Sequence, residues 1–270
     1  MSKRNTQTAK TAARERLRIE RERDAKKAKI KRQLVVAGSV VGVLAIAAGI
    51  GYAVVQGNKP SAWEAAADAK LVKPANTSGE NGTTVVIGKA DAKKTLELYE
   101  DPRCPICASF EQNVGETIDK AVADGKYKIQ FIGAAFLDRN LTGEGSKNAL
   151  SALGAALNVS PEAFLAYKSA LYSAEFHPEE SQDKFKDDSY LIEVANSVEE
   201  LKGNKEFQTA VENGTYDKWA LEMSDKFDSS DVQGTPTLKM DGEKLTGSDG
   251  QNAPMTAPEF TAAIDKALKA

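Results

Sequence analysis

Side chains that could hold a metal ion are scarce in this sequence. Its 270 residues include two cysteines, Cys104 and Cys107, and one histidine, His177, which lies far along the chain in a polar stretch. Zinc sites usually need three or four protein ligands, so a half zinc site is an unfavourable alternative for the cysteine pair and we expect no metal. His177 precedes a proline, and we predict it to be a loop residue rather than a proton shuttle.

Cofactor and export signals are absent as well. No flavin- or quinone-binding motif occurs, so we expect no bound cofactor, and electron transfer would need an outside partner. The basic N-terminal region has no Arg-Arg pair of the kind used in twin-arginine export, and no cysteine near the following apolar run could carry a lipid. The chemistry of the chain is therefore expected at the two thiols themselves.

The two cysteines lie in a Cys-Pro-Ile-Cys motif at residues 104–107, between a predicted strand at 95–99 and a predicted helix. Proline suits the first position of a helix, and Pro105 is followed by an apolar face made of Phe110, Val114 and Ile118. This pattern places the sulfur of Cys104 at the helix N-terminus, where free amide groups and the helix dipole stabilise a thiolate. Arg103 adds a positive charge beside it.

A purely structural disulfide is the other alternative for the cysteine pair. Closing so short a loop would stabilise the fold little through chain entropy. Two thiols at this spacing can instead open and close a small disulfide ring, so redox exchange is the favoured interpretation.

Charge is distributed unevenly along the chain. Residues 1–32 hold thirteen Lys or Arg and four Asp or Glu, a net charge of +9, and the rest of the chain has a net charge of −12. Nucleic-acid binding is one explanation for the basic segment. A position beside a membrane already explains this charge, because basic residues are retained on the cytoplasmic side and contact anionic lipids, so we expect no nucleic-acid partner.

Residues 34–55 form an uninterrupted run of 22 uncharged residues. At about 1.5 Å per residue, such a helix spans roughly the 30 Å of a bilayer core. A buried core helix or a cleavable signal peptide would usually have a shorter apolar run. We predict a single transmembrane helix, with residues 1–33 in the cytoplasm and the cysteines outside it, at the cell membrane.

Residues 56–82 are rich in Gly, Pro, Ser and Asn, and we predict a flexible linker there. Trp63 within this segment would lie either at the lipid headgroups or against the domain. The ordered domain is expected to begin near Thr83 and to cover residues 83–270.

The domain has the pattern of an α/β fold. Strands are predicted at 84–87, 95–99, 127–132, 237–240 and 243–245. A strand, the Cys-bearing helix and the next strand imply a right-handed crossover with parallel pairing. Asp241-Gly242 predicts a tight hairpin turn, and Thr256 with Glu259 predicts a capping box at the start of the last helix.

Residues from 144 to about 227 lack strand patterns and are predicted to form a helical insertion in this α/β domain. Its helices are expected at 148–157, 161–172, 190–201, 205–212 and 216–227. Their aromatic and aliphatic stripes are explained by core packing alone.

Three segments, Gly88–Ala92, Leu98–Cys107 and Val232–Thr237, carry a combined signature. With the helical block between the last two, they resemble the thioredoxin-fold thiol–disulfide oxidoreductases of the DsbA-like group, and the layout is similar to the membrane-anchored forms of actinobacteria. The resemblance implies a thioredoxin-like fold in which the Thr235–Pro236 bond is cis and lies opposite the active-site sulfur. It also implies that the backbone of Thr235 pairs with a substrate polypeptide. Taken alone, this Thr-Pro pair would be an ordinary turn.

The mechanism implied by the resemblance is exchange through a mixed disulfide with secreted or surface proteins. A substrate thiolate attacks Cys104, and a second substrate thiolate then releases the product disulfide; in reverse, Cys107 resolves the mixed disulfide. An oxidase reoxidised by a quinone-coupled membrane protein is the first interpretation, and a reductase or isomerase is the alternative. A membrane-tethered peptide-binding module is a third, although it would not need both sulfurs.

Three positions depart from the pattern of that family. Ile106 stands where strong oxidases often carry histidine, so one contact that stabilises the thiolate is missing. Pro102 replaces a common aromatic residue, and Leu98 stands where thioredoxins hold a buried acid. The sequence leaves open which nearby carboxylate accepts protons: Glu97, Glu100 or Asp101.

Overall fold

The computed structural model describes residues 61–269 and part of the basic tail, namely residues 14–16, 18, 21–23, 26, 27, 29 and 31. The chain divides into two units, Met1–Ser61 and Ala62–Ala270. The described tail residues are helical and exposed, and Arg18 pairs with Glu22 at 3.2 Å. Among the described residues, no helix is both long and apolar enough to cross a bilayer, and the span predicted at 34–55 lies outside them.

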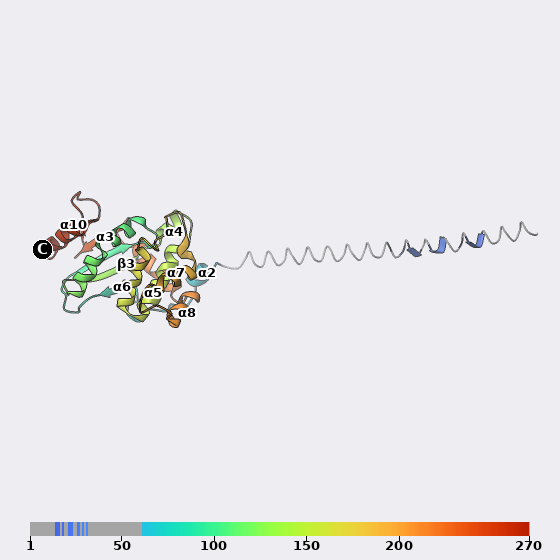
Figure 1. The fold of residues 1–270 in the computed structure, drawn as a ribbon, viewed down its shortest axis with the longest axis horizontal. Coiled ribbons are helices and arrows are strands. Elements are labelled where there is room, and N and C mark those ends of the chain that lie inside the picture. Colours follow the sequence, from blue (N-terminus) through green and yellow to red (C-terminus); the bar gives the residue numbers. More distant parts are fainter. Residues whose placement is uncertain are drawn as a thin grey trace, which may run out of the picture. The chain divides into compact units, whose positions relative to one another are not determined.

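The second unit contains a five-stranded sheet in the order β1-β3-β2-β4-β5. Figure 1 shows its strand β3 among the surrounding helices. The strands are β1 (Val85–Ile87), β2 (Thr95–Glu100), β3 (Lys128–Gly133), β4 (Thr237–Met240) and β5 (Glu243–Leu245). β2 and β3 are parallel and are joined by helix α3 (Pro105–Ala123), whereas the other neighbouring pairs are antiparallel. The predicted crossover is confirmed, and it brings the cysteines to the end of a central strand.

The signals that end these elements act as the sequence predicts. Gly125 takes a positive φ of 79° just after α3, and Asp241 and Gly242 both have positive φ, as the tight hairpin turn between β4 and β5 requires. At the start of α10 (Ala257–Ala267), the hydroxyl of Thr256 accepts a hydrogen bond from the Glu259 amide at 3.4 Å. α10 then packs on α3.

A block of helices lies between β3 and β4, as predicted. It comprises α4 (Phe136–Asn140), α5 (Gly145–Val159), α6 (Pro161–Tyr172), the 3₁₀ helix η1 (Lys184–Lys186), α7 (Asp188–Ala195), α8 (Lys205–Glu212) and α9 (Asp217–Asp228). α5 is buried along most of its length and contacts α6, α8 and α9. The helix predicted over 190–201 stops at Ala195 instead, because the Asn196 side chain accepts a hydrogen bond from the Gly203 amide and closes a turn.

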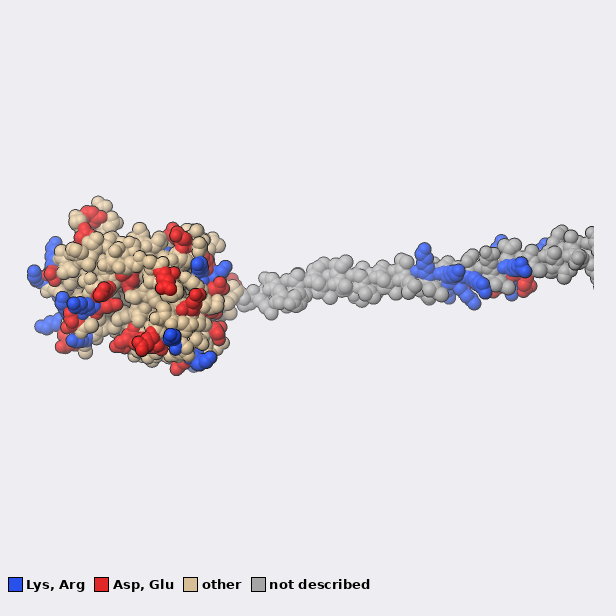
Figure 2. All heavy atoms as spheres, in the orientation of Figure 1, with Lys and Arg blue, Asp and Glu red and all other residues tan. Residues whose placement is uncertain are grey.

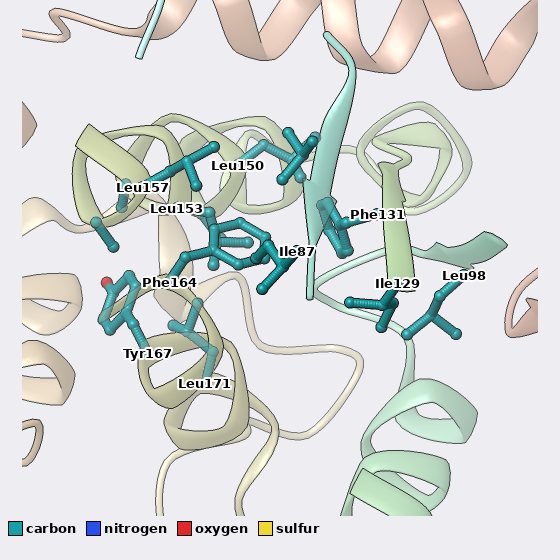
Figure 3. Close-up of a cluster of buried hydrophobic side chains, with 14 of the residues drawn as sticks. Ile87, Leu98, Ile129, Phe131, Leu150, Leu153, Leu157, Phe164, Tyr167 and Leu171 are labelled. Atoms are coloured by element: carbon teal, nitrogen blue, oxygen red, sulfur yellow. The ribbon is translucent and has the colours of Figure 1, made fainter. Parts of the chain in front are cut away.

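The insertion and the sheet share one hydrophobic core. Phe131 of β3 and Phe164 of α6 meet edge to face with ring centroids 5.2 Å apart, and Leu150 of α5 belongs to the same cluster (Figure 3). Such an aromatic pair contributes about 0.5–1.5 kcal/mol beyond its burial. The insertion therefore packs on β3. This strand pairs with β2, which leads into the segment that carries the cysteines.

Residues 62–82, called here the N-terminal strap, pack on the insertion and differ in this from the flexible linker predicted at 56–82, of which residues 56–60 lie outside the described residues. The Trp63 ring lies 5.1 Å from the Lys147 ammonium group, and the indole of Trp219 donates a hydrogen bond to the Gly82 carbonyl at 2.7 Å. The strap contains one short helix, α2 (Ala62–Ala67). Composition alone cannot separate a free linker from a coil that satisfies the polar groups of neighbouring helices. The ordered domain thus begins before Thr83.

The surface of the second unit is acidic. Residues 61–270 include 22 Lys or Arg and 35 Asp or Glu. In Figure 2, acidic side chains are spread over the visible face of this unit, with basic side chains among them. Such a balance attracts cationic partners and repels anionic ones.

Candidate active site

Cys104 is the N-cap residue of α3, and Pro105 is the first helical residue, as the sequence predicts. The Cys104 sulfur accepts a hydrogen bond from the Cys107 amide at 3.4 Å. Both cysteines are free thiols, with Cys104 6% exposed and Cys107 fully buried. Cys104 is therefore the sulfur that a second molecule can reach first.

The two thiols have pKa values displaced in opposite directions. The hydrogen bond from the Cys107 side chain is the main cause that lowers the pKa of Cys104 to about 6; burial opposes it, and Thr235 and backbone amides lower the pKa further. Burial raises the pKa of Cys107 well above its ordinary value, and the neighbouring Cys104 and Glu100 add to this. At pH 7 the outer sulfur is thus mostly thiolate, by about ten to one, and the inner sulfur is a thiol.

The loop before β4 lies against the outer sulfur. The Thr235–Pro236 peptide bond is cis, as the resemblance implied, and the Thr235 carbonyl oxygen lies 3.6 Å from the Cys104 sulfur. The Thr235 hydroxyl is buried without a hydrogen-bond partner among the described residues. Two segments far apart in sequence therefore meet at Cys104, and the second places a backbone carbonyl next to the reactive sulfur.

Arg103 is adjacent to Cys104 in the sequence, but its side chain forms ion pairs with the insertion. Its guanidinium is buried, 2.9 Å from a carboxylate oxygen of Asp138 and 3.2 Å from one of Asp183. Gly143 lies so close that a Cβ there would be 2.3 Å from the guanidinium nitrogen. The positive charge is balanced by two carboxylates of the insertion, so Arg103 ties the cysteine loop to that insertion.

Two of the three carboxylates left open by the sequence are engaged elsewhere. Glu97 accepts a hydrogen bond from the Tyr99 hydroxyl at 2.6 Å. Asp101 accepts from the Ser146 hydroxyl at 2.6 Å and from the amides of residues 103 and 137, and burial raises its pKa to about 7. Asp101 therefore fixes the turn that leads into Cys104.

Glu100 is the carboxylate that is electrostatically linked to both sulfurs. It is fully buried, and neither oxygen has a hydrogen-bond partner among the described residues, although the Lys168 ammonium lies 3.4 Å away. Burial is the main cause that raises its pKa to about 8, against the attraction of Lys168, and the charge of Cys104 raises it further. Near neutral pH this carboxyl group is mostly protonated.

Comparison with known proteins agrees with this geometry. A family profile described as Thioredoxin matches residues 80–266. The chain belongs to the thioredoxin family. Over 157 residues it is 27% identical to the disulfide bond formation protein D of Bacillus subtilis, covering 57% of this chain and 65% of that protein.

Two further proteins are similar to this thioredoxin-family chain. It is 28% identical over 158 residues to the serine/threonine-protein kinase PknE of Mycobacterium tuberculosis, covering 56% of this chain and only 27% of the kinase. The crystal structure of oxidised DsbA from Mycobacterium tuberculosis matches with a TM-score of 0.56 and 23% identity, covering 69% of this chain and 93% of that one. The latter shows a shared fold.

The groups near Cys107 in this thioredoxin-family site were not predicted from the sequence. The Lys168 ammonium donates to a Glu111 carboxylate oxygen at 2.5 Å, and both side chains are buried. Tyr172 belongs to the same buried cluster as the two cysteines. A signal existed, because Lys168 lies four residues after Phe164 and Glu111 lies four after Cys107, so both fall on the buried face of their helix.

His177 lies outside any helix, as predicted, yet it comes close to the cysteine loop. Its Nε2 lies 3.1 Å from the Pro102 carbonyl oxygen, and its ring stacks on Tyr172 with centroids 5.9 Å apart. Burial lowers the pKa of His177, so the ring is neutral at pH 7. Among the described residues, no cluster of three or more metal-binding side chains occurs.

Proposed function

We propose that the chain is a thiol–disulfide oxidoreductase that acts on polypeptides through Cys104 and Cys107, most simply as an oxidase of the DsbA kind. The observation that carries the proposal is the opposite displacement of the two thiol pKa values beside the cis Thr235–Pro236 loop. A stabilised thiolate is a good leaving group and favours the reduced enzyme, which makes the oxidised enzyme a donor of disulfides. The similarity to disulfide bond formation protein D supports this activity.

In the proposed reaction, the oxidised enzyme takes two electrons from its substrate. A substrate thiolate attacks the Cys104 sulfur, the Cys104–Cys107 bond breaks, and a mixed disulfide forms while Cys107 leaves as a thiolate. A second substrate thiolate attacks the substrate sulfur of the mixed disulfide, and Cys104 leaves as the stabilised thiolate. The substrate gains a disulfide, and both enzyme cysteines are then reduced.

We assign the proton transfer at Cys107 to Glu100. The leaving Cys107 thiolate is buried and strongly basic, so it needs a nearby proton. Glu100 is mostly protonated near pH 7, is fully buried and interacts electrostatically with both sulfurs. When the enzyme is reoxidised, the same carboxylate takes the proton back from Cys107.

We further propose that this reaction takes place outside the cytoplasm at the cell membrane. The uncharged run at 34–55 and the basic segment before it support a single span with residues 1–33 in the cytoplasm. The substrates would then be secreted or surface proteins with cysteines. The chain has no flavin or quinone motif, so turnover would need an outside electron acceptor, and the resemblance to the DsbA-like group suggests a quinone-coupled membrane protein.

The reduction potential of the Cys104–Cys107 couple tests the oxidase assignment. The full-length chain is equilibrated with glutathione buffers, and the fraction oxidised is measured by thiol trapping. A potential near or above about −180 mV is expected, because the reduced form is the stabilised one. A potential near about −270 mV would make the chain a reductant and would favour the reductase alternative.

A further inference from the structure

A groove of about 650 Å³ lies next to the reactive sulfur. One wall is the start of α3, where Pro105 is exposed and Ile106 is 55% exposed. The other wall is residues 246–256 between β5 and α10, called here the groove loop, which lies beside α10 in Figure 1. Thr235, whose carbonyl contacts the Cys104 sulfur, also lines the groove.

The charge that lines this groove has one sign. Asp249 of the groove loop and Glu259 of α10 are the charged side chains among its described lining residues, and no Lys or Arg lines it. Apolar surface comes from Ile106 and Met255. The groove therefore combines an apolar wall next to the sulfur with two carboxylates.

Hydrogen bonds hold both carboxylates in place. Asp249 accepts from the amides of Gln251 and Asn252 at 2.9 and 3.0 Å, and Glu259 accepts from the Ser248 hydroxyl at 2.6 Å. These bonds lower the pKa of both carboxyl groups, so both stay charged at neutral pH. A carboxylate can accept about four hydrogen bonds, so each retains acceptor capacity for a second molecule.

We infer that the groove selects polypeptides that carry a Lys or Arg close to the reacting cysteine. The inference rests on the proposed function and names the substrate class of the same site. An extended substrate segment would place an apolar side chain on Ile106 and a cationic side chain against Asp249 and Glu259. Fixed carboxylates suit this task because little side-chain freedom is lost when the ion pair forms.

The two carboxylates contribute unequally. The Lys244 ammonium donates to the Gln251 carbonyl at 2.9 Å and lies close enough to Asp249 to lower its pKa. Lys244 lines the neighbouring groove on the other side of the loop. It offsets part of the charge of Asp249, so Glu259 provides the larger share of the selectivity.

Matched peptides with a single cysteine test the inference. They share one sequence with an apolar residue beside the cysteine and differ in having Arg or Glu at successive nearby positions. The oxidised full-length chain is mixed with each peptide at low ionic strength, and the rate of disulfide exchange is measured. We expect the Arg peptide to react about tenfold faster at the best position, with the ratio decreasing as salt is added.

Two double variants distinguish the effect of the groove carboxylates on the rate ratio from the effect of the overall acidic charge. In Asp249→Asn/Glu259→Gln the ratio should fall to about twofold, whereas in Glu199→Gln/Glu200→Gln, which removes two exposed charges from the insertion, it should persist. Equal ratios in the wild type and the groove variant, with uncharged dithiothreitol still oxidised by both, would overturn the inference alone. Failure of the wild type to oxidise dithiothreitol or any peptide would overturn the proposed function instead.

Discussion

The two sulfurs of the active site face different surroundings. Beside Cys104 lies an open groove with exposed Ile106 on its wall. Around Cys107 lies a closed cluster in which Glu100 is 0% and Lys168 is 2% exposed. The same short motif thus holds two thiols of different character: the outer sulfur has a lowered pKa and can be reached from outside, and the inner sulfur has a raised pKa and is shielded from water.

Removing the inner sulfur should have the largest effect. In Cys107→Ala the Cys104 thiolate can still attack a disulfide but cannot release its partner, so we expect turnover to be abolished and covalent adducts to accumulate. Non-reducing electrophoresis with mass spectrometry measures the adducts. Cys104→Ala is the matched control and should trap nothing. An unchanged set of partners without covalent adducts in Cys107→Ala would favour a membrane-tethered binding module.

Removing the cation of the closed cluster should cost the most stability. Lys168→Met leaves the buried Glu100 and Glu111 without their partner, and we expect the free energy of unfolding to decrease by about 3–5 kcal/mol. Denaturant unfolding at pH 7 measures this. Lys218→Met removes a partly exposed pair with Glu222 and should cost less than about 1 kcal/mol. Similar losses in the two variants would show that the Lys168 cluster has no special role.

Replacing the buried Glu100 should slow the reaction of Cys107 and leave the pH dependence of the Cys104 reaction in place. In Glu100→Gln, resolution of a mixed disulfide by Cys107 should slow by about a hundredfold, because its proton acceptor is gone. The rate of Cys104 alkylation should still rise with pH through a midpoint near 6, since the thiolate is the reactive form.

The matched control for this variant is Glu97→Gln, which changes a carboxylate on the same strand whose partner is Tyr99. Both rates should stay close to those of the wild type in this control. If Glu100→Gln and Glu97→Gln slow resolution equally, the assignment of the proton to Glu100 fails.

The smallest effect is expected far from either sulfur, in the N-terminal strap. Trp63→Ala removes the contact with Lys147, and the free energy of unfolding should decrease by about 0.5–1 kcal/mol with no change in the alkylation midpoint. Thermal unfolding and the alkylation profile together measure this. A shift of the midpoint would show that the strap acts on the site.

The parts of the fold that follow local rules could be predicted from the sequence. The Cys104 N-cap, the hairpin turn at Asp241 and the Thr256 N-cap each depend on a few adjacent residues, and the structure has them in place; of the predicted capping box at Thr256, the bond from the Glu259 amide is present. The pairing of Lys168 with Glu111 could not be predicted, because it joins two helices whose relative placement the periodicity does not fix. The packing of the predicted linker segment could not be predicted for the same reason, because the strap contacts residues that are far away in the sequence.

The strap also determines where a pull on the chain would act. The amide of Ser78 donates to the Thr84 carbonyl and the amide of Thr84 to the Ser78 carbonyl, both at 3.0 Å, so the strap is clipped to the segment that leads into β1. In mechanical terms, a force applied at the start of the strap would meet α2 and then this clip before it met β1, the first strand of the sheet.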